Sequence, residues 1–124
     1  MQAPLSLRVT LGLAAALNLL GTVVFGSAAL GRPLMPLTPA PPPFYAAQIA
    51  LTIALFGGVY AWLAGQRVIN RPLLLVGALG KLGFFLLFVA FWLAGDIGQA
   101  QVRQATPDLL FGAVFLWYLA RSRA

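Results

Sequence analysis

Lys81 is a basic side chain in the middle of an apolar run, residues 71–95, that is long enough to cross a bilayer. An ammonium group at the centre of a membrane helix costs roughly 2.5–3.5 kcal/mol on insertion scales, so it usually faces other helices. There it has a partner or a function, because its amine can bind an anion, act as a base or form a Schiff base. Lys81 therefore marks the place where any chemistry in this chain would be found.

Two further polar residues are predicted at a similar depth in the membrane. At about 1.5 Å per residue from the predicted inner edge, Asn18 lies roughly 15 Å deep, Lys81 roughly 13 Å and Asp108 roughly 18 Å. Because they belong to three different predicted helices, they indicate an internal polar site or a structural lock. A direct contact between Lys81 and Asp108 is left open, since the carboxylate should lean outward. The alternative for Lys81 is to extend toward the inner surface over Gly77.

An apolar pocket could adjoin these polar residues. Phe84 and Phe88 form an aromatic stripe that begins a turn beyond Lys81, which either belongs to a hydrophobic core or walls a ligand pocket. Gln48 and Thr52, from another predicted span, would lie nearer the outer face. Such a pocket suits a lipid, an isoprenoid or a quinone. The predicted ligand-binding residues are Lys81, Asp108, Asn18, Gln48, Thr52, Phe84 and Phe88.

Asp108 has a second, local interpretation. Thr106, Pro107 and Asp108 match an N-cap, a first-turn proline and a first-turn acid, and so predict that the last helix opens here. A helix over 108–120 would be only about 20 Å long, too short for a hydrocarbon core of roughly 30 Å. The preceding stretch, 98–106, would then dip inward and form a polar vestibule.

The composition places the whole chain in the membrane. Of its 124 residues, 61% are hydrophobic and 8% are charged, against roughly 25% charged residues in soluble domains. Cysteine, histidine and glutamate are absent, which leaves Asp96 and Asp108 as the only acidic side chains. We therefore assign no catalytic or metal-binding residue. The net charge of +6 comes from arginines that flank apolar segments, so a nucleic-acid partner is disfavoured.

The apolar runs predict a single all-α domain, an integral membrane four-helix bundle. The spans are expected near 9–30, 44–65, 73–94 and 108–120. A linker at 31–43 contains six prolines, so it cannot be helical and is expected to form a stiff outer loop. The first run could instead be a signal peptide, but it is long for one and carries Asn18, so we favour a retained helix.

Arginine positions predict the orientation. With both termini inside, the inner side carries more arginine than the outer side, as membrane proteins generally do. The inner arginines are Arg8, Arg67, Arg71, Arg121 and Arg123, and the outer charges are Arg32, Asp96 and Arg103.

Glycines at intervals of three in the third span, at Gly77, Gly80 and Gly83, predict close approach between helices. Gly57 and Gly58 interrupt the second span in the same way. Packing is the simplest interpretation of both groups, and an exposed small-residue face could also accept a partner helix.

The sequence resembles small four-helix bacterial inner-membrane proteins, loosely of the DoxX-like type. The resemblance is carried by Phe56-Gly-Gly-Val-Tyr60, by Gly77-Ala-Leu-Gly-Lys-Leu-Gly-Phe-Phe85 and by the lone Asp108 of the fourth span. Such families have no agreed chemistry, so the resemblance implies only a multi-pass protein of the bacterial inner membrane. Small multidrug-resistance transporters have a similar length, but they need a glutamate in the first helix where this chain has Asn18.

Three functions remain open. The first is a non-catalytic membrane protein that binds an apolar small molecule or serves as an accessory subunit, with a membrane-protein partner or a second copy of the chain. The second is a transporter of ions or small molecules that uses Lys81, Asp108 and Asn18. The third is a lipid-modifying enzyme with Lys81 as base or Schiff-base amine, which nothing in the sequence requires. No cofactor can be named.

Overall fold

The computed structural model describes residues 2–37 and 40–121 and confirms the all-α class. Its helices are α1 (Leu5–Ala29), α2 (Pro43–Ala64), α3 (Arg71–Leu93) and α4 (Gln99–Arg121). By length and composition α1, α2 and α3 could each cross a membrane. Arg123 and residues 38–39 of the proline-rich linker lie outside the described residues.

Local sequence signals set several helix boundaries. Pro43 and Pro72 occupy the first turns of α2 and α3, where the missing N–H costs nothing. The Asn70 side chain caps α3 by accepting a hydrogen bond from the Leu73 N–H at 3.1 Å. After α3 the chain turns at Gly95, whose φ of 86° is one that residues with a Cβ rarely adopt.

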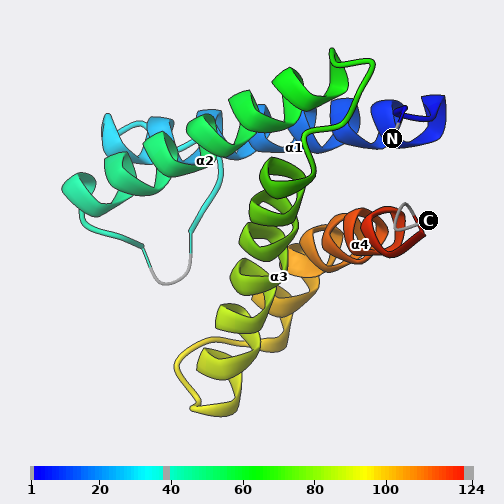
Figure 1. Cartoon of the computed structure of the whole chain (residues 1–124). Helices are drawn as coiled ribbons and strands as arrows, with labels where there is room; N and C mark the ends of the chain where they lie inside the picture. Colours follow the sequence, from blue (N-terminus) through cyan, green and yellow to red (C-terminus); the bar gives the residue numbers. More distant parts are fainter. Residues whose placement is uncertain (1, 38–39, 122–124) are drawn as a thin grey trace.

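The helices pair into two antiparallel hairpins, α1 with α2 and α3 with α4 (Figure 1). Contacts within each hairpin are extensive, whereas contacts between the hairpins are few. Figure 1 shows α3 running away from α1 and α2 at a steep angle, so the hairpins diverge toward the loop that joins α3 to α4. The bundle is therefore V-shaped and not a set of four parallel rods.

All four helices meet at one end of the molecule, here called the packed end. It comprises residues 5–18 of α1, 57–64 of α2, the loop 65–70, 71–81 of α3 and 108–121 of α4. The hydrophobic core lies there and consists of Leu7, Leu11, Ala14, Tyr60, Leu63, Ile69, Leu74, Ala78 and Phe115. Polar contacts close the same end. Ser6 is hydrogen-bonded to Tyr118, and Arg8 Nε donates to the Ala64 carbonyl at 2.8 Å.

The opposite end, here called the splayed end, comprises the remaining halves of the helices and the described residues of the loops that join α1 to α2 and α3 to α4. No residue of α1 beyond Asn18 and no residue of α3 beyond Lys81 is buried. In α1 and α3 the side chains there are nevertheless mostly apolar, and Leu20, Leu86 and Leu93 are more than half exposed. Because exposed apolar surface of this extent is unfavourable in water, it must face lipid or a partner.

Candidate functional site

The fourth helix begins at Gln99, so the expectation that Thr106 and Pro107 open it is wrong. The stretch 98–106 is helical from Gln99 onward and does not dip inward as an irregular vestibule. Pro107 lies inside the helix, where its missing N–H leaves the carbonyl of Arg103 without its usual helical partner. Asp108 is therefore a mid-helix residue that faces α3 instead of a helix-capping acid.

Lys81 and Asp108 form a direct ion pair, which settles the contact that the sequence left open. Lys81 Nζ lies 2.7 Å from Asp108 Oδ1, and the two side chains are only 4% and 13% exposed. The charges neutralise each other where water is excluded, and a charge-assisted hydrogen bond of this kind is stronger than a neutral one. The pair joins the middle of α3 to the middle of α4.

Asn18 extends the ion pair to the other hairpin. Its Oδ1 accepts a second hydrogen bond from Lys81 Nζ at 2.7 Å, and its Nδ2 donates to the Ile53 carbonyl of α2 at 3.0 Å. Asn18 is 7% exposed, and both the oxygen and the nitrogen of its amide are hydrogen-bonded. Lys81, Asp108 and Asn18, here called the polar cluster, thus connect all four helices through three side chains and one backbone carbonyl.

Aromatic rings cover the remaining side of the ammonium group. Lys81 Nζ lies 5.1 Å from the ring centroid of Tyr60 and 5.5 Å from that of Phe111, within the range of a cation–π contact. The Tyr60 hydroxyl donates to the Gly77 carbonyl at 2.9 Å, which holds its ring against α3. Two acceptors and two rings therefore surround the charge inside the protein.

Sequence reasoning missed Tyr60 and Phe111 as members of this environment. Phe111 follows Asp108 by three residues, so helical periodicity alone places both on one face. Tyr60 carried a weaker signal, namely a phenol within an apolar span that needs a hydrogen-bond acceptor. The Ile53 carbonyl had no signal, because backbone groups of a helix look alike in sequence.

Gln48 and Thr52 lie away from the polar cluster. Both are exposed on the first half of α2, and the Thr52 hydroxyl donates to the Gln48 carbonyl one turn earlier, at 2.9 Å. The structure does not bring them to Lys81, Asp108 or Asn18, since their half of α2 belongs to the splayed end.

Phe84 and Phe88 lie on α3 just beyond the polar cluster. Their ring centroids are 4.8 Å apart, and both side chains are half-buried. They belong to the part of α3 that has no buried residue. They therefore form an apolar surface next to the polar cluster.

Close helix approach depends on four glycines near the polar cluster. The tightest is Gly112 of α4, where an added Cβ would lie 2.6 Å from Leu82 Cγ. A Cβ on Gly77 would lie 2.8 Å from Tyr60 Cε1, and one on Gly80 would lie 2.7 Å from Phe56 Cε1. A Cβ on Gly57 would lie 3.1 Å from Asn18 Cβ. Gly58 and Gly83, by contrast, face open space. The predicted close approach therefore holds at the packed end and around the polar cluster, but not at Gly58 or Gly83.

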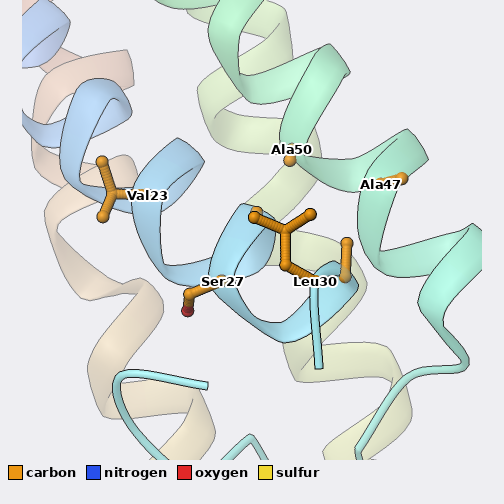
Figure 2. A pocket seen from close by; sticks show the side chains of 7 residues that line it. Val23, Ser27, Leu30, Ala47 and Ala50 are labelled. Carbon is orange, nitrogen blue, oxygen red and sulfur yellow. The ribbon is translucent and has the colours of Figure 1, made fainter. Parts of the chain in front are cut away.

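A separate hollow lies between the end of α1 and the start of α2 (Figure 2). It is open, measures about 540 Å³ and is almost entirely apolar. Its lining residues are Val23, Gly26, Ser27, Ala29, Leu30, Ala47 and Ala50. The Ser27 hydroxyl is already used, since it donates to the Val24 carbonyl at 2.7 Å and accepts from the Leu34 N–H at 3.0 Å. A molecule bound in the hollow would therefore be held by apolar contacts and by the shape of the surface.

The fold and the polar cluster define an all-helical protein with membrane-type helices and a buried ion pair at its centre. Comparison with protein families, curated proteins and solved structures found no match to the chain. The function must therefore be argued from the geometry itself.

Proposed function

We propose that this chain is a non-catalytic, multi-pass protein of the bacterial inner membrane that serves as an accessory subunit of a membrane complex. In this proposal both termini are inside. A partner helix, from another membrane protein or from a second copy of the chain, packs against the apolar surface of the splayed end.

The observation that carries the proposal is that burial along α1 and α3 stops at the polar cluster. The packed end has its own core, and its buried cation is matched within the chain by Asp108 and Asn18. The splayed end keeps large apolar side chains uncovered along α1 and α3. Helices in membranes associate through surfaces that allow close approach, and Gly83 supplies such a place next to Phe84.

The polar cluster itself supports a structural role and not a chemical one. A base or nucleophile must be free to accept or transfer a proton in a place that a substrate can reach. Lys81 is instead 4% exposed, hydrogen-bonded twice and flanked by Tyr60 and Phe111. A lysine bonded in this way holds the two hairpins together at a fixed angle.

Native mass spectrometry after mild, lipid-preserving extraction tests the proposal with a matched pair of variants. Gly83→Leu adds bulk to the splayed end, and Gly12→Leu adds the same bulk to an exposed position of the packed end. Neither glycine has a neighbour within 4 Å of an added Cβ, so both variants should fold. We expect a stoichiometric protein partner, or a dimer, with the wild type and with Gly12→Leu but not with Gly83→Leu.

A bare chain in all three samples would contradict the accessory role. Loss of the partner from both variants alike would place the contact elsewhere than the splayed end. Circular dichroism of the same samples should show unchanged helix content, which separates loss of the partner from loss of the fold.

A second candidate function is binding of an apolar small molecule such as a lipid, an isoprenoid or a quinone. The hollow between α1 and α2 favours it, because its volume of about 540 Å³ falls within the range of small-molecule pockets, roughly 300–1,000 Å³. Gly26→Leu would fill this hollow without meeting another side chain within 4 Å of its Cβ. A bound mass that persists in Gly12→Leu and disappears in Gly26→Leu would establish this function.

A transporter remains the alternative for the polar cluster. It requires Lys81 to exchange Asp108 for a substrate or an ion during a cycle. Transport by the wild-type chain that is abolished in Lys81→Leu, with the fold retained, would replace the accessory role by this one.

A further inference from the structure

Arg71 lines a second open hollow, at the packed end between the start of α3 and the end of α4. The hollow measures about 590 Å³. Its other lining residues are apolar, namely Pro72, Leu75, Leu116, Leu119 and Ala120. Arg71 is thus the one charged residue in an otherwise apolar lining. It is far along α3 from the polar cluster and separate from the apolar hollow of α1 and α2.

The guanidinium group of Arg71 is incompletely satisfied by the protein. Nη2 donates to the Leu119 carbonyl at 3.0 Å, whereas Nη1 is buried without a hydrogen-bond partner. A guanidinium has five N–H donors in a planar fork that matches the oxygens of a phosphate group. A buried N–H without an acceptor is unfavourable, so Arg71 gains if its side chain turns toward the hollow and Nη1 meets an acceptor there.

No acidic side chain of the described residues is placed to neutralise Arg71. Asp108 is paired with Lys81, and Asp96 follows α3 at the splayed end. The packed end also carries three more arginines in the described part of the chain, Arg8, Arg67 and Arg121. The Arg121 guanidinium stacks over the Trp117 ring at 4.8 Å. This end of the molecule therefore has an excess of positive charge.

We propose that this hollow binds one anionic phospholipid, with its phosphate on Arg71 and an acyl chain along Leu75 and Leu116. Arg71 is the first residue of a membrane-type helix, which puts its guanidinium at headgroup level. Leu75 lies one helical turn further into that helix and is 42% exposed, so it offers apolar contact below the headgroup. A free phosphate would use only the guanidinium, whereas a phospholipid uses the guanidinium and the apolar wall together. This inference does not depend on the proposed accessory role, which concerns the opposite end.

Lipid titration of the purified full-length chain in detergent, followed by native mass spectrometry, tests the inference. The probes are phosphatidylglycerol, phosphatidylcholine and glycerol phosphate. We expect phosphatidylglycerol to bind one to one, and to bind more tightly than phosphatidylcholine because only its headgroup has a net negative charge. Arg71→Gln should weaken it roughly tenfold or more, since the charge-assisted bond is lost. The matched control Arg32→Gln, which removes an exposed arginine of the splayed end, should leave it unchanged.

Leu75→Trp is a second variant that keeps Arg71 and fills the apolar part of the hollow. It should weaken the binding of phosphatidylglycerol and leave any binding of glycerol phosphate unchanged. Arg71→Gln also removes the hydrogen bond from Arg71 to the Leu119 carbonyl, which could prevent folding. In that case Leu75→Trp tests the inference by itself.

Three results would overturn the inference. The first is equal affinity for phosphatidylglycerol and phosphatidylcholine. The second is an equal loss of affinity for phosphatidylglycerol in Arg71→Gln and in Arg32→Gln. The third is binding of glycerol phosphate as tight as that of the lipid and insensitive to Leu75→Trp, which would mean a free anion as ligand.

Discussion

The packed end and the splayed end are built from the same four helices, and α1, α2 and α3 are apolar at both ends, yet only the packed end has a common core. At the packed end, Leu7, Leu74 and Phe115 are fully buried. At the splayed end, the half of α3 beyond Lys81 has no buried residue. Apolar composition alone therefore does not decide where membrane-type helices pack against one another.

The polar cluster and the glycines account for the difference. Lipid tails are as apolar as leucine, so helices in a membrane gain little from hiding leucine from lipid and associate through polar contacts and close packing. Gly77 lets Tyr60 approach α3, and Gly57 lets Asn18 approach α2. Beyond Lys81, an added Cβ on Gly83 would meet no neighbour, and the half of α3 that follows has no buried residue.

Removal of Asp108 should have the largest effect on stability of the variants that test this comparison. Asp108→Ala leaves Lys81 buried without its counter-charge, and breaking a buried ion pair costs about 3–5 kcal/mol of the free energy of unfolding. Asp96→Ala, which removes the exposed acid of the splayed end, should change it by less than about 0.5 kcal/mol. Denaturant unfolding in a mild detergent, followed by circular dichroism, measures both variants.

The paired variant Lys81→Leu with Asp108→Leu sharpens the same test. Replacement of both partners by apolar residues is often neutral or stabilising, by about 1–4 kcal/mol, whereas Lys81→Leu alone should be destabilising because Asp108 loses its partner. If Lys81→Leu by itself preserved or raised the stability, the charge would be merely tolerated and the polar cluster would not lock the hairpins.

Substitution of two glycines of α3 by alanine should give a difference in stability of intermediate size. Gly77→Ala places a Cβ 2.8 Å from Tyr60 Cε1, and this ring is buried and hydrogen-bonded, so it has little room to move. Gly83→Ala meets nothing within 4 Å and should gain up to about 1 kcal/mol from helix propensity. Because both variants gain that propensity, Gly77→Ala should be less stable than Gly83→Ala by about 1–3 kcal/mol, the cost of overpacking. Equal thermal stabilities in detergent would refute the close approach at Gly77.

Two hydroxyl groups give the smallest effect. Tyr60→Phe removes the buried bond to the Gly77 carbonyl and should cost about 0.5–1.5 kcal/mol. Thr52→Val removes the exposed bond to the Gln48 carbonyl within the splayed part of α2 and should change the stability by less than about 0.5 kcal/mol. The same unfolding measurement compares them, and a cost for Thr52→Val as large as that for Tyr60→Phe would mean that the splayed end is also held by buried polar contacts.

The helices and the identity of the polar residues were largely predictable from the sequence. The all-α class follows from long apolar runs, and α2 and α3 begin at Pro43 and Arg71, within two residues of the starts expected at 44 and 73. The start of α4 was not predictable in the same way. Thr106 and Pro107 have the local signature of a helix start, but the helix continues through them from Gln99 because α4 packs against α3. Tertiary packing overrode a local signal there.

The sequence by itself determined that Lys81 needs partners, because an isolated cation is unfavourable in an apolar span. It also determined which partners existed, since Asp108 is one of only two acidic side chains and Asn18 is polar at a similar depth. Only the tertiary structure decided that Lys81 reaches both of them at once, and that Gln48 and Thr52 lie elsewhere. The crossing angle of the two hairpins decides this, and it is set by contacts between helices that no single helix encodes.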